Sequence, residues 1–232
     1  MTTEVVHSDL LSATEFLDYE SPVVREFVNK ALPGDSGSLS DIGRAVALYY
    51  AVRDGIHYEV YGMDMSRAGF RASVIIERGM GFCVHKSIVY AAAVRAVGIP
   101  SRILFGDVRN HLASERLQHL IGGDVFRFHS LTSVFLDGQW VKATPVFNRM
   151  LCQLYKIAPL DFDGRTDSLY HPYDEKKRKH MEFLRMRGEF ADFPYDMVVN
   201  GIRRAHPKLF KTSDELTKGS LVAEASRWPS LQ

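Results

Sequence analysis

The sequence predicts a mixed fold with a buried helix and an antiparallel β-hairpin at its centre. Two glycines within residues 79–81 interrupt the chain, and from Cys83 to about Val97 the residues again favour helix. Further along, two strand-like segments are joined by Asp137-Gly138, a pair that supplies the positive φ angles of a type I′ turn. The length of 232 residues allows a single domain over 1–232, with a core over about 40–150 and a helical or loop extension over 151–232.

The segments before Cys83 are predicted to be mainly helical. A first helix is expected near 20–31, with Pro22 suited to its first turn, and a second over 41–53 with Ser40 as its cap. Residues 56–61 alternate briefly between apolar and polar. Residues 71–77 can form a short helix closed by Gly79, which delivers the chain to Cys83.

The segments after the central helix are predicted to begin with strands. A strand is expected over 101–108, a polar excursion over 109–124, and the hairpin over 126–136 and 139 to about 146. Residues 174–187 place Met181, Phe183 and Leu184 at helical spacing among basic residues, which predicts a helix with a solvated face. A last helix is expected over 197–210, followed by a polar tail.

Composition excludes several classes of protein. Hydrophobic residues make up 46% of the chain and charged residues 25%, which is typical of a soluble globular protein, and the net charge of +1 does not indicate a nucleic-acid partner. No apolar run approaches the roughly 20 residues that span a bilayer, and residues 1–12 hold no basic region typical of a signal peptide. The sequence therefore predicts a cytoplasmic protein without membrane partners, and it does not indicate an oligomeric state.

Neither a disulfide framework nor a metal site is expected. The chain has two cysteines, Cys83 and Cys152, so a four-cysteine zinc site is excluded, and Cys152 is expected to be an inert buried residue. His111 and His119 lie eight residues apart without other ligands at a suitable spacing. The three aspartates in residues 158–167 do not match a calcium loop. No cofactor is indicated.

Cys83 is the candidate nucleophile. It stands at a predicted helix start, where unpaired backbone N–H groups and the positive end of the helix dipole favour a thiolate and lower the pKa. Attack on an amide carbonyl further needs a base, a group that orients the base, and donors for the oxyanion. The Cys83 backbone N–H is one candidate for these donors.

His129 is the candidate base. If Leu136 faces Gln139 across the turn, Leu131 faces Thr144 and His129 faces Val146, so His129, Thr144 and, if the strand continues, Asn148 share one face of the hairpin. Thr144 and Asn148 are then both diagonal neighbours of His129. His85 is a rival by proximity in sequence, but residues two apart on a helix point about 200° apart, so it cannot reach the thiol.

Several of these residues resemble a known family. The pattern is similar to that of the transglutaminase-like (papain-like thiol) superfamily, including its bacterial-type cysteine peptidases, over roughly residues 42–148: Gly81-Phe82-Cys83, Ala92, Arg95-Ala96-Val97-Gly98-Ile99-Pro100-Ser101-Arg102, His129, and Leu136-Asp137-Gly138-Gln139-Trp140-Val141. The resemblance implies an α+β fold, in which a central helix carrying the cysteine packs on an antiparallel sheet carrying the histidine. It also implies acyl transfer or hydrolysis at amide bonds, and a catalytic triad completed by an aspartate.

The sequence departs from the family at the third member of that triad. The family aspartate usually follows the hairpin tryptophan by four residues, and here that position is Thr144. Asn148 is the better chemical match, because a Cys-His-Asn set works in papain-like enzymes. Pro145 disturbs the strand and can turn Asn148 elsewhere. Both Thr144 and Asn148 therefore remain candidates.

Two functions are open from the sequence. The first is a thiol-dependent peptidase, amidase or acyltransferase that forms an acyl-Cys83 intermediate with a peptide or small amide substrate, with water as the default acceptor. The second is a catalytically weak or inactive binding or scaffold protein with the same fold, which the missing aspartate favours. The pKa of Cys83 discriminates between them, because a value well below that of a free thiol favours catalysis.

Overall fold

The computed structural model describes residues 8–32, 34, 39–111, 113–169, 181–210 and 218–226. No helix in these ranges is both long and apolar enough to cross a membrane. The α-helices are α1 (Pro22–Ala31), α2 (Asp41–Gly55), α3 (Ala72–Arg78), α4 (Cys83–Ala96), α5 (Glu115–Ile121), α6 (Arg149–Tyr155), α7 (Tyr195–Ala205) and α8 (Leu221–Ser226). The 3₁₀ helices are η2 (Ala68–Phe70) and η3 (Pro207–Phe210), and the strands are β1 (His57–Tyr58), β2 (Met80–Gly81), β3 (Ser101–Asn110), β4 (Val125–Leu136), β5 (Gln139–Ala143) and β6 (Met181–Phe190).

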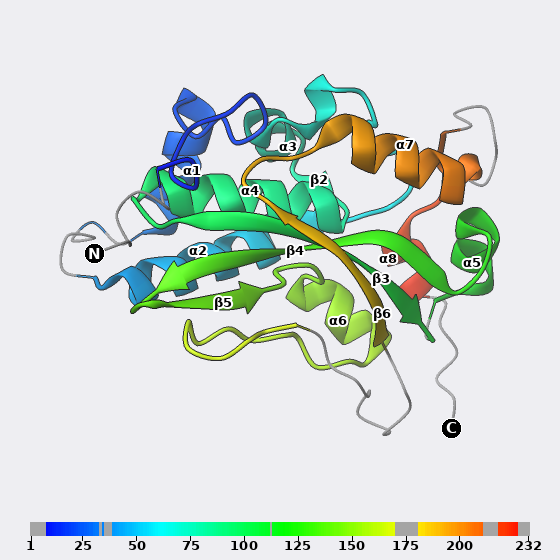
Figure 1. Ribbon diagram of the computed structural model, residues 1–232. Helices are drawn as coiled ribbons and strands as arrows, with labels where there is room; N and C mark the ends of the chain where they lie inside the picture. The colour runs from blue at the N-terminus through cyan, green and yellow to red at the C-terminus, as the bar shows by residue number, and fades with distance from the viewer. Residues whose placement is uncertain are drawn as a thin grey trace.

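Four strands form an antiparallel sheet in the order β5-β4-β3-β6 (Figure 1). In the hairpin, Leu136 lies opposite Gln139 and Thr132 opposite Ala143, so the predicted register is confirmed. The ladder ends at Ala143, three residues before the predicted end. The reason is Pro145, which has no N–H to donate to a neighbouring strand. The next N–H, that of Val146, donates to the Thr144 carbonyl at 2.8 Å and so forms a local turn.

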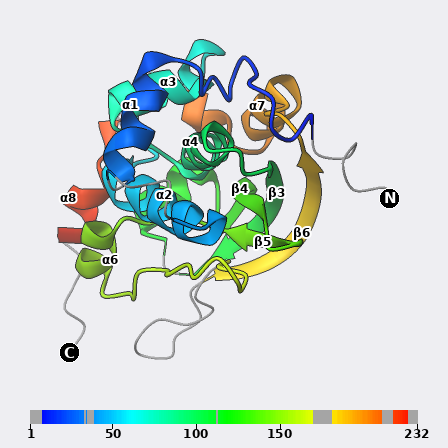
Figure 2. The same cartoon turned by 90° about the vertical axis from the view of Figure 1, so that its left-hand side faces the viewer.

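Helix α4 forms the centre of the molecule. It lies between the sheet on one side and α1, α2 and α3 on the other (Figure 2). All of its residues from Cys83 to Arg95 are buried, and apolar side chains lie on every side of the helix. The predicted buried central helix is therefore confirmed, and with the sheet it gives the α+β architecture.

Polar side chains of α4 hold the neighbouring segments in place. The fully buried Lys86 donates to the carbonyls of Arg53 and Ile56, at the end of α2 and the start of the segment that contains β1. The Tyr90 hydroxyl donates to the Ala45 carbonyl at 3.0 Å. The bonds from Lys86 satisfy carbonyls at the end of α2 and fix the segment that leads to Tyr58 against α4, and the bond from Tyr90 holds the first half of α2 against α4.

The helix predicted over residues 174–187 is wrong where the chain is described. Met181–Phe190 forms β6, the edge strand of the sheet, with Ile103 opposite Phe190 and Asn110 opposite Met181. Residues 174–180 lie outside the described ranges. Two register shifts between β3 and β6 break the strict alternation that identifies a strand in sequence. The extension after residue 150 thus contributes a strand to the central sheet in addition to helices and loops.

Among the described residues, three short α-helices occur in segments for which the sequence predicts no particular helix. Helix α5 interrupts the polar excursion of 109–124, where the Ser114 side chain accepts the Leu117 N–H and Gly122 ends the helix at φ 89°. Helix α6 follows the hairpin directly, and α8 lies in the polar tail. Both α5 and α8 border the cavity described below.

Candidate active site

Two glycines direct the chain into α4 so that Cys83 is its first residue. Gly79 ends α3 at φ 68°, a conformation that favours glycine. Gly81 pairs with Tyr58 in the short parallel β1–β2 bridge, and a Cβ atom at Gly81 would lie 2.5 Å from the Cβ of His85. Only a glycine permits this close approach of β2 to α4, and the approach fixes where Cys83 begins the helix.

The sulfur of Cys83 faces backbone N–H groups from two elements. The preceding residue, Phe82, provides no side-chain cap for α4. The N–H groups of Ser130 on β4, of Val84 and of Cys83 itself donate toward the sulfur and lower its pKa. Burial has the larger effect and raises the pKa of the Cys83 thiol to about 11. The prediction that Cys83 is a thiolate is therefore wrong for this conformation, because burial of the sulfur raises its pKa more than the start of the helix lowers it.

His129 directly precedes Ser130 and is positioned by a bulge in β4. The register between β3 and β4 shifts at this point, and Phe128 has φ 59°. Asp107 of β3 accepts the Phe128 N–H at 3.3 Å and ion-pairs with Arg187, whose guanidinium lies 4.2 Å from the Phe128 ring centroid. Burial lowers the pKa of His129 to about 4, so its imidazole is neutral at pH 7.

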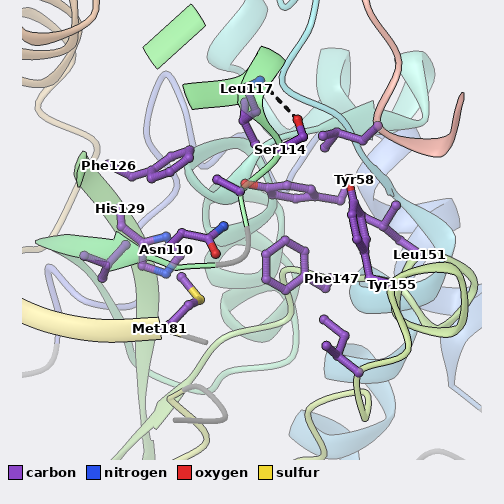
Figure 3. A pocket seen from close by; sticks show the side chains of 14 residues that line it. Tyr58, Asn110, Ser114, Leu117, Phe126, His129, Phe147, Leu151, Tyr155 and Met181 are labelled. Carbon is purple, nitrogen blue, oxygen red and sulfur yellow. Dashed lines mark hydrogen bonds between the residues drawn. The ribbon is translucent and has the colours of Figure 1, made fainter. Parts of the chain in front are cut away.

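His129 lies at the border of two cavities. The larger, of about 610 Å³ including its open side, is also lined by Asn110 and by Tyr58. In Figure 3, His129 and Asn110 lie on one side of it, and Tyr58 on the other. The smaller, of about 390 Å³, is lined by His129 together with Thr144. Among the described residues that line either cavity, none carries a carboxylate.

The two candidates for the third catalytic residue differ in their surroundings. Thr144 lies just beyond β5, and its buried hydroxyl has no hydrogen-bond partner. The amide oxygen of Asn148 accepts the Tyr58 backbone N–H at 3.2 Å, and Asn148 is not among the residues that line the two cavities at His129. Thr144 thus shares a cavity with His129, whereas Asn148 holds the β1 segment.

The other histidines considered in the sequence lie elsewhere. The ring of His85 stacks on Phe70 at 4.6 Å and 3°, and meets Phe82 edge-on, so it is part of the core behind the helix start. His111 lies 3.4 Å from the Glu182 carboxylate. Within the described ranges, no group of three or more His, Cys, Asp or Glu side chains is arranged to hold a metal ion.

Two residues of the site had no signal in the sequence. The pKa of Tyr58 is raised mainly by burial and next by charge on Cys83, which indicates that the two side chains lie close together. Asn110 is the last residue of β3 and brings an amide group to the cavity wall. Both come from segments that the sequence identifies only as short or polar, and their positions depend on how distant strands pair.

The neutral thiol gives a testable pH dependence. Alkylation requires the thiolate, so for a pKa of about 11 we expect the rate at Cys83 with iodoacetamide to rise about tenfold per pH unit from about pH 7 to 10. The measurement is peptide-level mass spectrometry, which separates Cys83 from Cys152, whose pKa is also raised by burial. A plateau between about pH 5 and 8 would instead indicate a thiolate–imidazolium pair and contradict this expectation.

Comparisons with known proteins identify one matching family and two similar crystal structures. The model of a family described as the transglutaminase-like superfamily matches residues 29–145, which is 117 of the 232 residues. No curated protein matches the chain. Two crystal structures are similar: a "Putative Cysteine Protease" from Cytophaga hutchinsonii (14% identity, TM-score 0.44) and a "putative protease" from Parabacteroides distasonis (15% identity, TM-score 0.37). The alignments cover 62% and 59% of this chain but only 43% and 26% of those proteins.

Proposed function

Since the chain belongs to the transglutaminase-like superfamily, we propose that it is a cysteine peptidase or amidase that forms an acyl-enzyme on Cys83. The observation that carries the proposal is the surroundings of the sulfur. Backbone N–H groups of Ser130, Val84 and Cys83 are directed at it, and His129, adjacent to Ser130, borders a cavity that is open on one side. A cysteine with only a packing role needs neither feature.

The proposed reaction proceeds in two steps. His129 takes the thiol proton as the sulfur attacks the amide carbonyl carbon, and N–H groups at the start of α4 donate to the developing oxyanion. The carbon–nitrogen bond then breaks, and the leaving amine takes the proton from His129. In the second step His129 removes a proton from water, which attacks the thioester, and the acid product leaves as the Cys83 thiol reforms. Transfer to an amine in place of water would follow the same steps.

Thr144 and Asn148 have separate roles in this proposal. The Thr144 hydroxyl, which has no hydrogen-bond partner in the structure, would accept a hydrogen bond from the far nitrogen of His129 during the reaction, since both residues line the smaller cavity. Asn148 acts through Tyr58, whose backbone it holds near Cys83. A hydroxyl stabilises imidazolium less than a carboxylate would, so the proposed enzyme has a modest rate.

The test is detection of the acyl-enzyme. The protein is mixed with an activated ester or a peptide amide, quenched in acid and analysed by intact and peptide-level mass spectrometry. We expect a mass increase equal to that of the acyl group, located on the peptide that contains Cys83. A Cys152→Ala variant serves as the matched control and should acylate like the unmodified protein. Absence of an adduct, or the same adduct in Cys83→Ala, would overturn the proposal.

A binding function without catalysis is the second candidate. The observation in its favour is that burial keeps both Cys83 and His129 neutral, and that no carboxylate of the part of the chain that the structure describes lines the cavities at His129. This candidate predicts that peptides bind with equal affinity to the unmodified protein and to Cys83→Ala, and that neither protein forms an adduct. The acylation experiment therefore separates the two functions.

Substitution Thr144→Asp tests the third position directly. A carboxylate beside His129 favours the imidazolium, so we expect the pKa of His129 to rise by about 1–3 units and turnover to increase by about 10-fold or more. The measurements are NMR titration of the imidazole and kcat. Thr144→Val, which conserves volume but lacks the hydroxyl, is the matched control and should not raise either value. An unchanged His129 pKa in Thr144→Asp would mean that the two side chains do not interact.

A further inference from the structure

Among the residues that the structure describes, no charged side chain lines the larger cavity at His129. Four aromatic rings contribute to its wall, from Tyr58, Phe126, Phe147 and Tyr155, and most of the remaining lining is aliphatic. Apart from the hydroxyls of its tyrosines, its polar side chains are His129, Asn110 and Ser114. Figure 3 shows these rings around the cavity, with His129 and Asn110 together at one side. The cavity thus combines an apolar body with polar groups beside the proposed catalytic histidine.

The third of these polar side chains is already engaged. The Ser114 hydroxyl accepts the Leu117 N–H at 3.1 Å and donates to the Glu224 carboxylate at 2.6 Å. Glu224 also accepts the Tyr61 hydroxyl at 2.5 Å. The Ser114 hydroxyl and the Glu224 carboxylate therefore both form hydrogen bonds that hold protein segments together.

Carboxylates near the cavity hold its wall and do not line it. Glu59 accepts the backbone N–H groups of Val60, Tyr61 and Leu221, the last at 3.0 Å. Through this bond and through Glu224, helix α8 is tied to the rest of the domain, and Leu221 of α8 forms part of the cavity wall. The apolar wall is therefore fixed in place, and the acids that fix it do not offer a partner to a cationic ligand.

From this lining we infer that the cavity binds a large uncharged side chain of the substrate, aromatic or branched aliphatic, next to the amide bond attacked by Cys83. The inference rests on the proposed function. The volume of about 610 Å³ includes the open side of the cavity, through which such a group would enter from solvent. A charged side chain would lose its hydration there without gaining a partner among the described lining residues, whereas an aromatic ring would gain apolar contact. The cavity thereby selects against acidic and basic residues beside the scissile bond.

The first test uses the unmodified protein and two series of capped fluorogenic peptides. One series varies the residue that contributes the scissile carbonyl and the other the residue that contributes the amine, through Phe, Leu, Ala, Glu and Lys, with alanine elsewhere. In one of the series we expect kcat/KM for Phe and Leu to exceed that for Glu and Lys by about 100-fold. Values within threefold of one another in both series would overturn the inference and leave the proposed function standing.

The second test reduces the cavity at Ala113, which is 7% exposed and lies in its wall. For Ala113→Leu we expect the ratio of kcat/KM for the Phe peptide to kcat/KM for the Ala peptide to fall about 10-fold or more. Ala68→Leu, on the exposed surface of η2, is the matched control and should change neither value. If Ala113→Leu does not fold, the peptide series on the unmodified protein still decides.

Binding separates this inference from the proposed chemistry. Isothermal titration of the Cys83→Ala variant with the same capped peptides measures recognition when the nucleophile is absent. If the unmodified protein cleaves none of the peptides but Cys83→Ala binds the Phe peptide at least 10-fold more tightly than the Glu peptide, the peptidase proposal fails and the cavity assignment stands. Equal affinities for the Phe and Glu peptides would contradict the assignment.

Discussion

Replacing Cys83 by alanine is expected to lower kcat for an amide substrate by on the order of 10⁴-fold or more, because no other side chain can form the acyl-enzyme. Replacing His129 by glutamine is expected to lower kcat by about 10²–10⁴-fold, since the thiol then has no base to accept its proton. The two residues act in one step, so the double variant should be no slower than Cys83→Ala alone. Steady-state kinetics on one peptide amide measures all three variants.

The control for these variants is His119→Gln, at an exposed histidine of α5. Its kcat should stay within twofold of that of the unmodified protein. Thermal unfolding of each variant establishes that the loss of activity is not a loss of fold. A His129→Gln variant that keeps more than one-tenth of the original kcat would remove His129 from the mechanism. The nearest alternative base, His85, is held in the core by its stacking on Phe70.

The parts of the site that the sequence predicts are those with local causes. The glycines at 79 and 81 and the apolar run after Cys83 are enough to locate the start of α4. Asp137-Gly138 fixes the hairpin register, because a two-residue turn leaves one pairing for the strands it joins. From that register the sequence puts Thr144 on the same side of the hairpin as His129, and the two line one cavity.

The parts that the sequence does not predict depend on contacts between distant segments. β6 pairs with β3 across about 80 residues of chain, and its bulges hide the alternation of a strand. The pKa of Cys83 is set mainly by burial, which no local pattern reveals, so the helix-end effect alone gave the wrong direction. Tyr58 and Asn110 enter the cavity for the same reason, since each is placed by strand pairing and not by a motif.

The largest expected effect on stability lies at the other end of α4, at Arg95. Its guanidinium is buried, and among the described residues no carboxylate forms an ion pair with it. It donates to the Ser101 hydroxyl at 3.0 Å and to backbone carbonyls of Ser12, Ser101 and Ala191. Burial lowers the pKa of Arg95 to about 10, so it remains charged at pH 7. One side chain therefore joins α4 to the N-terminal segment, to β3 and to the link between β6 and α7.

For Arg95→Leu we expect the free energy of unfolding to fall by about 3–5 kcal/mol, because the removed donors leave carbonyls from three segments without their partner, including the carbonyl of the fully buried Ser101. The free energy of unfolding of Arg95→Lys should lie between those of the unmodified protein and of Arg95→Leu. A single ammonium cannot reach all the acceptors that are spread around a planar guanidinium. Urea unfolding measures these values, and Arg25→Leu, on the exposed face of α1, should remain within about 0.5 kcal/mol of the unmodified protein. A loss below about 1 kcal/mol for Arg95→Leu would mean that the three segments are held by apolar packing alone, since the carbonyls would then find water or other donors without cost.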